Sequence, residues 1–157
     1  MEPHSIRHSP HREAIQAVQQ AALAAVEPGA AVRCHVQLEG ERLTVGGKTY
    51  DLAAVERIWL VGGGKAATAT IAALYGVLGD RVAGGLAVTK YDHVDPRLAT
   101  GPVEVVEAGH PLPDEAGVSG TRRLADVLAG ATSRDLVLAA ISGGGSALLV
   151  LPAPDLS

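Results

Sequence analysis

Two glycine-rich segments of this chain have the composition of anion-binding loops. They read Gly62-Gly63-Gly64-Lys65 and Ser142-Gly143-Gly144-Gly145-Ser146, and each stands between an apolar run and a stretch that favours helix. Glycine lets a backbone pass close to a phosphate or carboxylate, and the free N–H groups at a helix N-terminus attract negative charge. Two such units predict an anion site at the carboxyl edge of a parallel sheet.

Lys65 ends the first loop and is the candidate catalytic residue. The segment from Gly62 to Ala67 fits the G-x-G-x-x-A dinucleotide pattern. It is not a Walker A loop, because Trp59 stands where that pattern requires glycine and Ala66 where it requires serine or threonine. A lysine in the first turn of a helix opposes the helix dipole, so a nearby anion would favour it. Such a lysine can neutralise charge on a transferring phosphoryl group, and a solvated surface lysine is the alternative.

The second loop places three glycines between two hydroxyl groups. Its backbone could cradle a phosphate or a carboxylate, whereas Ser146 could instead cap the helix that follows. The loop does not fit G-x-S-x-G and has no Asp–His pair to activate Ser142 or Ser146, so no hydrolase nucleophile is predicted. We expect Gly144, the middle glycine, to need a positive φ or to lie against the anion.

His110 and Asp114 follow a predicted strand and therefore belong to the same sheet edge. Pro113 and Asp114 are typical of a helix start, where the Asp114 side chain would cap the helix. We favour that structural role for Asp114 and a role in the binding site for His110, although both are candidates for binding phosphate, nucleotide or substrate. Asp92 lies slightly past the position of the acidic residue that binds a ribose in dinucleotide folds, so we interpret it as a loop residue.

Hydrophobic periodicity predicts an α/β fold that is Rossmann-like, with helices flanking a mostly parallel sheet and right-handed crossovers. The predicted strands are 57–61, 84–89, 103–107 and 135–141, and the predicted helices are 11–26, 65–78 and 114–129. Pro28-Gly29 is expected to end the first helix, and residues 32–51 to form a small antiparallel meander. Residues 90–102 are interpreted as a loop.

Residues 1–10 are predicted to be a flexible tail. His4, His8 and His11 are spaced like metal ligands, but in a tail a solvated cluster is favoured, so the metal ligands stay unknown.

Composition excludes several classes of function. The chain has 157 residues, 47% hydrophobic and 19% charged, which predicts a globular domain with a core. Aromatic residues make up only 3%, so the core must be aliphatic, as in a parallel sheet buried on both faces. A net charge of −4 without a basic cluster argues against nucleic acid. Cys34 is the single cysteine, and no membrane-length apolar run or signal peptide is present, so a cytoplasmic protein is expected.

Three motifs in this order resemble the ATP-dependent glycerate 2-kinases, a family often labelled hydroxypyruvate reductase. The motifs run from Val61 to Ala66, from Gly109 to Gly117 and from Ile141 to Leu149. Family members have an N-terminal Rossmann-like domain and a C-terminal MOFRL domain. The resemblance implies phosphoryl transfer from ATP to the 2-hydroxyl of D-glycerate with Mg²⁺. It maps the family's loop lysine onto Lys65 and its Ser-Gly-rich loop onto residues 142–146.

Family members are more than twice as long as this chain. The resemblance therefore implies that residues 11–157 are an N-terminal part of the Rossmann-like domain, without MOFRL. The family's active site lies between the two domains and uses a C-terminal arginine, so the chain alone is expected to be an inactive kinase fragment. Its expected partners are D-glycerate and either the missing C-terminal half or further copies of itself. The alternatives are an NAD(P)-dependent hydroxypyruvate reductase and a non-catalytic nucleotide- or anion-binding module.

Overall fold

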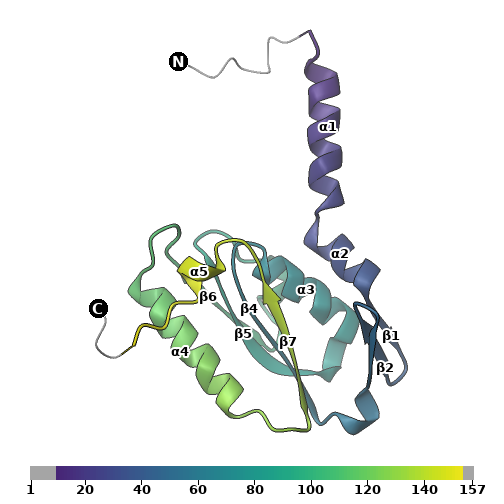
Figure 1. Ribbon diagram of the computed structural model, residues 1–157, viewed down its shortest axis with the longest axis vertical. Helices are drawn as coiled ribbons and strands as arrows, with labels where there is room; N and C mark the ends of the chain where they lie inside the picture. The colour runs from purple at the N-terminus through teal and green to yellow at the C-terminus, as the bar shows by residue number, and fades with distance from the viewer. Residues whose placement is uncertain (1–9, 154–157) are drawn as a thin grey trace.

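A four-stranded parallel sheet forms the centre of the computed structural model, which describes residues 10–153 (Figure 1). Its strands are β4 (Arg57–Gly63), β5 (Val82–Lys90), β6 (Val103–Ala108) and β7 (Asp135–Ile141). They are ordered β6-β5-β4-β7, and every pair is parallel. The predicted α/β, Rossmann-like fold with a mostly parallel sheet is confirmed. The tail histidines His4 and His8 lie outside the described residues.

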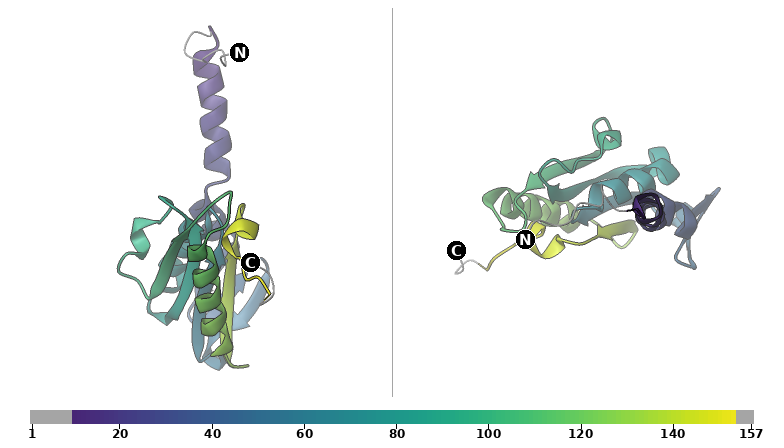
Figure 2. Two further views of the ribbon diagram at one scale, coloured as in Figure 1. Left: turned by 90° about the vertical axis from the view of Figure 1, so that its left-hand side faces the viewer. Right: turned by 90° about the horizontal axis from the view of Figure 1, so that it is seen from above.

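Two helices cover opposite faces of the sheet (Figure 2). Helix α3 (Ala67–Leu78) packs on β4 and β5, whereas α4 (Glu115–Ala129) packs on β5 and β6. Successive residues of a strand point to opposite faces, so β5 contributes Ala87 to the core under α3 and both Leu86 and Val88 to the core under α4. Short 3-10 turns, η3 (Gly79–Arg81) and η4 (Pro96–Leu98), flank β5.

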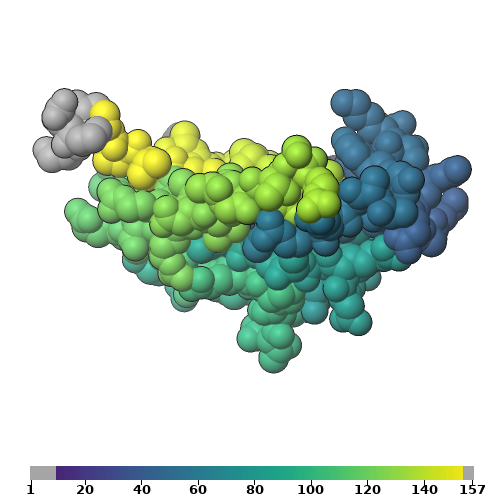
Figure 3. All heavy atoms as spheres, turned by 90° about the horizontal axis from the view of Figure 1, so that it is seen from below, coloured from purple at the N-terminus to yellow at the C-terminus, as the bar shows by residue number. Residues whose placement is uncertain are grey.

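The predicted meander is present but begins later than expected. Strands β1 (Val36–Glu39), β2 (Arg42–Val45) and β3 (Lys48–Asp51) form a separate antiparallel sheet, followed by the turn η2 (Leu52–Ala54). It lies at the opposite end of the molecule from α4, as Figure 3 shows in blue and green.

The first helix ends before Pro28-Gly29, as predicted, but residues 28–35 form a second helix, α2 (Pro28–His35), which was not predicted. Proline is tolerated at the first helical position, because the N–H that it lacks would have no partner there. The Glu27 carboxylate caps this helix by accepting the backbone N–H groups of Gly29 and Ala30, at 2.8 and 2.6 Å. The expected strand pairing of residues 32–35 is replaced by this helix.

Helix α1 (Arg12–Ala25) has the predicted position but not a buried face. None of its residues is buried, and Val18 and Leu23 are 70% and 71% exposed. Figures 1 and 2 show it as a rod that projects away from the sheet. None of the helices in the described part of the chain is long and apolar enough to cross a membrane.

Candidate functional site

Both glycine loops lie at one point of the sheet. Strands β5 and β6 lie on one side of β4. The chain then crosses back over the sheet, and β7 lies on the other side of β4. Ligands of open α/β sheets bind at the carboxyl ends of strands where the order reverses in this way. The first loop leaves β4 and the second leaves β7, so the two flank this switch point (Figure 1).

Three hydrogen bonds tie the two loops together. The backbone N–H of Ser142 donates to the Gly63 carbonyl, and that of Lys65 donates to the Gly143 carbonyl, both at 3.0 Å. The backbone N–H of Ala66 donates to Ser142 Oγ, also at 3.0 Å. Helix α3 begins at Ala67 rather than at residue 65, with Ala66 as its N-cap residue. Since Ala66 cannot cap with its own side chain, the Ser142 hydroxyl takes an N–H group of this turn as a cap would.

Two glycines are required by this geometry. Gly64 has φ +126°, and a Cβ there would clash with Ser142 Oγ. Gly144 has φ +92°, so the expected positive φ is confirmed. A Cβ on Gly144 would lie 2.9 Å from Cδ2 and Nε2 of His110 and 3.5 Å from Lys65 Cγ. Gly144 therefore marks the place where both loops and the His110 ring meet.

The short helix α5 (Gly145–Leu148) follows the second loop, and its N-cap is Gly144 in the left-handed conformation. The prediction that Ser146 could cap this helix was wrong, because Ser146 is its second residue and is exposed. The backbone N–H groups of Gly143, Gly144 and Ser146 have no acceptor in the described part of the chain. Such a run of free donors is suited to a phosphate or a carboxylate.

Asp114 serves the fold rather than the loops. It is the N-cap of α4, and its Oδ1 accepts the Gly117 N–H at 3.0 Å. Its Oδ2 accepts the Tyr91 hydroxyl at 2.8 Å. Hydrogen bonds from backbone N–H groups lower the pKa of the Asp114 carboxyl below its ordinary value, and the N–H of Gly109 has the largest effect. The capping interpretation is confirmed. The neighbouring His110 is half-buried, precedes a cis peptide bond to Pro111, and is the residue that reaches Gly144.

Thr89 is a supporting residue that sequence reasoning missed. Its buried hydroxyl donates to the Gly64 carbonyl at 3.1 Å, and the Gly64 N–H donates to the Val88 carbonyl at 3.1 Å. These bonds fix the first loop against β5. The available signal was a threonine at the end of the predicted strand 84–89, whose other residues are all apolar.

Asp92 does not take the place of a ribose-binding acid. It has φ +63° in the turn after β5, where its N–H donates to Glu107 Oε1 at 2.6 Å. Within residues 10–153, no group of three or more His, Cys, Asp or Glu could hold a metal ion.

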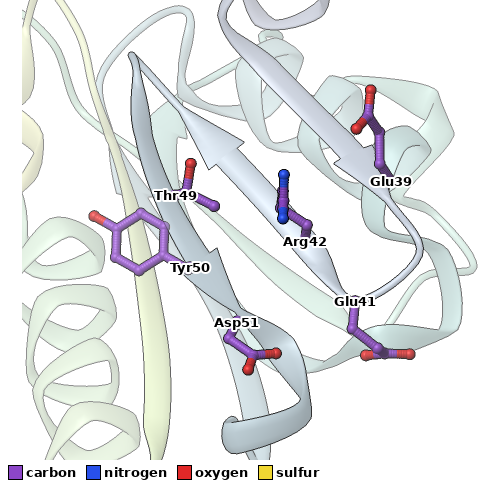
Figure 4. Close-up of a pocket in the computed structure, with 6 residues that line it drawn as sticks. All are labelled: Glu39, Glu41, Arg42, Thr49, Tyr50 and Asp51. Carbon is purple, nitrogen blue, oxygen red and sulfur yellow. The ribbon is translucent and has the colours of Figure 1, made fainter.

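A cavity of about 590 Å³ lies elsewhere, on the antiparallel meander (Figure 4). Its lining residues are Glu39, Glu41, Arg42, Thr49, Tyr50 and Asp51. Arg42 is the cross-strand register partner of both Glu39 and Asp51, so the one arginine of this lining has a carboxylate residue opposite it on each neighbouring strand. We therefore assign the candidate site to the glycine loops, where free donors and Lys65 converge, and not to the cavity on the meander.

A family model described as "Domain of unknown function (DUF4147)" matches residues 14–157. The chain belongs to this family. A relative from Pyrococcus horikoshii named glycerate 2-kinase is 35% identical over 87% of this chain and 29% of its own length. An Agrobacterium vitis protein, provisionally named hydroxypyruvate reductase, is 41% identical over 64% of this chain and 26% of its own length.

Solved structures agree with the DUF4147 assignment. A crystal structure of a P. horikoshii OT3 protein superposes with a TM-score of 0.80, with 34% identity, over 93% of this chain and 32% of its own. Glycerate kinase from Thermotoga maritima superposes with a TM-score of 0.66, with 32% identity, over 88% of this chain and 30% of its own. The chain thus spans about a third or less of the length of these relatives.

Proposed function

We propose that this DUF4147 domain supplies the anion-binding part of a glycerate 2-kinase, an enzyme that transfers a phosphoryl group from ATP to the 2-hydroxyl of D-glycerate. One observation carries the proposal. The free N–H groups of the second loop, the Lys65 side chain and the His110 ring are gathered around Gly144 by two loops bonded to each other. Two relatives that carry glycerate kinase names support the choice of reaction.

Phosphoryl transfer depends on positioning and on neutralising charge more than on covalent chemistry from the protein. Lys65 would offset negative charge on the transferring phosphoryl group, because a fixed cation is most effective where charge develops. The N–H groups of Gly143 and Gly144 would hold the oxygens of a phosphate or of the glycerate carboxylate. A Cβ at Gly144 would fill the space beside His110 and Lys65, so a glycine at this position leaves room for such a ligand.

Mg²⁺ fits this part of the chain less well. The described residues offer no group of three acidic, His or Cys side chains, and Mg²⁺ commonly binds nucleotide phosphates together with one or two carboxylates. Phosphates of ATP and residues outside this domain would have to hold the ion, so we assign no magnesium ligand here.

Ligand titration tests the proposal on the chain as it is. We expect ATP or D-glycerate to bind in calorimetry and to shift backbone amide NMR signals of residues 143–146. Lys65→Ala should weaken binding at least severalfold, whereas Lys48→Ala, which removes an exposed lysine of the meander, should not. The assignment would be contradicted if neither ATP nor D-glycerate bound, or if the Lys65→Ala and Lys48→Ala variants bound the ligand equally well.

A reductase is the second candidate, because the first loop fits the dinucleotide pattern and one relative carries a reductase name. Binding of NADH in place of ATP in the same titration would favour it. Binding without turnover, once the remaining part of a relative is supplied, would favour a non-catalytic module.

A further inference from the structure

The turn that follows β5 is fastened at both of its ends to the first glycine loop and the helix after it. Thr89 and Thr68 are the buried polar side chains among the residues that the structure describes, 0% and 1% exposed. The Thr89 hydroxyl donates to the Gly64 carbonyl, and the Thr68 hydroxyl, in the first turn of α3, donates to the His93 carbonyl at 2.7 Å. Burial of a hydroxyl is costly unless it makes a hydrogen bond. Both threonines therefore serve to hold residues 89–93 at the carboxyl edge of the sheet.

Further hydrogen bonds hold the same turn from the side of β6 and α4. The Tyr91 N–H donates to the Ala108 carbonyl at 3.3 Å, and the Tyr91 hydroxyl donates to Asp114, which caps α4. Asp92 has φ +63°, a left-handed conformation that is uncommon for residues other than glycine, and its N–H is held by Glu107. A turn with this many bonds to other elements presents its exposed side chains in fixed positions.

The imidazole ring of His93 is exposed and has a defined tautomer. Its Nδ1 lies 3.0 Å from the Tyr91 carbonyl oxygen. A carbonyl oxygen can only accept a hydrogen bond, so Nδ1 carries the proton, and Nε2 of the neutral ring is left as an acceptor. Within residues 10–153, Nε2 makes no hydrogen bond. The ring therefore offers a lone pair to a ligand at this edge of the sheet.

The glycine-loop site described above lacks an acceptor for a hydroxyl group. Its free groups are backbone N–H groups and the ammonium group of Lys65, which all donate. Ser142 Oγ already accepts a backbone N–H, and the Asp114 carboxylate is occupied by the start of α4. In the described part of the chain, no hydrogen bond fixes the tautomer of His110, so that ring is not assigned as an acceptor. Nε2 of His93 is an oriented acceptor that remains.

We propose that Nε2 of His93 accepts the hydrogen bond of the 2-hydroxyl of D-glycerate, while the loops after β4 and β7 bind the anionic groups. The inference rests on the proposed function. It adds to that function the residue that distinguishes a 2-hydroxy acid from the same acid without this hydroxyl. The turn after β5 thus sets the specificity for the group that receives the phosphoryl group.

Histidine NMR tests this assignment on the chain as it is. Proton–nitrogen correlation spectra distinguish the two neutral tautomers, and we expect His93 in the Nδ1–H form. Saturating D-glycerate should shift the Nε2 signal, whereas 3-hydroxypropanoate, which keeps the carboxylate but lacks the 2-hydroxyl, should not. If neither ATP nor D-glycerate bound, the proposed function and this inference would both be overturned. D-glycerate binding that leaves the Nε2 signal of His93 unchanged would overturn this inference alone.

Substitutions in the same turn decide which side chain binds the hydroxyl. We expect the chain to bind D-glycerate about tenfold or more tightly than 3-hydroxypropanoate in calorimetry, because the analogue leaves a polar group without its partner. His93→Ala should lose most of this difference.

Two control variants should keep the difference between the two acids. Asp92→Gly removes the neighbouring carboxylate at a positive φ that glycine adopts freely, and His35→Ala removes an exposed histidine at the end of α2. Circular dichroism should show each variant folded. An unchanged difference in His93→Ala, or its loss in Asp92→Gly, would overturn the proposal.

Discussion

The hydroxyl oxygen of Ser142 lies 3.0 Å from the backbone nitrogen of Ala66, which is 76 residues earlier in the chain. This bond joins the loop after β7 to the first turn of α3. It makes Ser142 a positioning residue for Lys65, whose own N–H is held by Gly143. A serine that looks like a phosphate ligand in the sequence thus has a structural partner already.

Replacing this serine should loosen the first loop. Ser142→Ala removes a capping acceptor, so we expect a loss of about 1 kcal/mol in the free energy of unfolding, measured by urea denaturation. Ser146→Ala is the control, because that side chain is exposed and has no hydrogen-bond partner in the described structure. An equal effect of the two substitutions would contradict the positioning role.

Gly144 should tolerate no side chain. Its φ of +92° disfavours other residues by about 1–2 kcal/mol, and a Cβ would press on the His110 ring. We expect Gly144→Val to abolish ATP and D-glycerate binding in calorimetry while circular dichroism shows the sheet intact. Gly143→Ala is the matched control, since a Cβ there meets nothing within 4 Å. Unchanged affinity in Gly144→Val would remove this loop from the site.

Lys65 should contribute to turnover once the remainder of a relative is supplied. Loss of one electrostatic stabiliser typically costs about 10²-fold in kcat, so we expect at least that for Lys65→Ala, measured as D-glycerate-dependent ADP release. Lys48→Ala should leave kcat unchanged. A loss of only a few-fold in folded Lys65→Ala protein would return this residue to the surface-lysine interpretation.

The Arg57–Asp135 pair predicts a pH dependence of stability. Hydrogen bonds from Arg57, and then from the Thr132 N–H, lower the pKa of Asp135 to about 2 from an ordinary value of 3.8. A carboxyl whose folded pKa is depressed contributes stability above its unfolded pKa and loses it as the pH falls toward the folded one. We therefore expect the difference in urea midpoint between wild type and Asp135→Asn to shrink from pH 6 to pH 2. A difference that stays constant over this range would show that ionisation of Asp135 does not stabilise β7.

Local sequence patterns predicted the helices and strands of this fold well, because an aliphatic strand or a glycine-rich turn can be recognised from a few consecutive residues. The strands at 57–61 and 135–141 and the cap at Asp114 needed no tertiary information. The helix at Pro28 was missed because the same dipeptide is common at helix ends and helix starts, and only the Glu27 contacts decide between them. The bonds between the two loops could not be predicted, since they depend on β4 and β7 becoming neighbours.

Strand order also bears on how the chain folds. β4, β5 and β6 pair with their neighbours along the chain, but β7 must return to β4, and Arg57 and Asp135 are separated by 78 residues. Closing a longer loop costs more conformational entropy before any contact compensates for it, so this pairing should form late. An anion held jointly by the loops after β4 and β7 would bind only chains that have completed this step. Such a ligand would therefore stabilise the complete four-stranded sheet relative to folding intermediates in which β7 has not yet paired with β4.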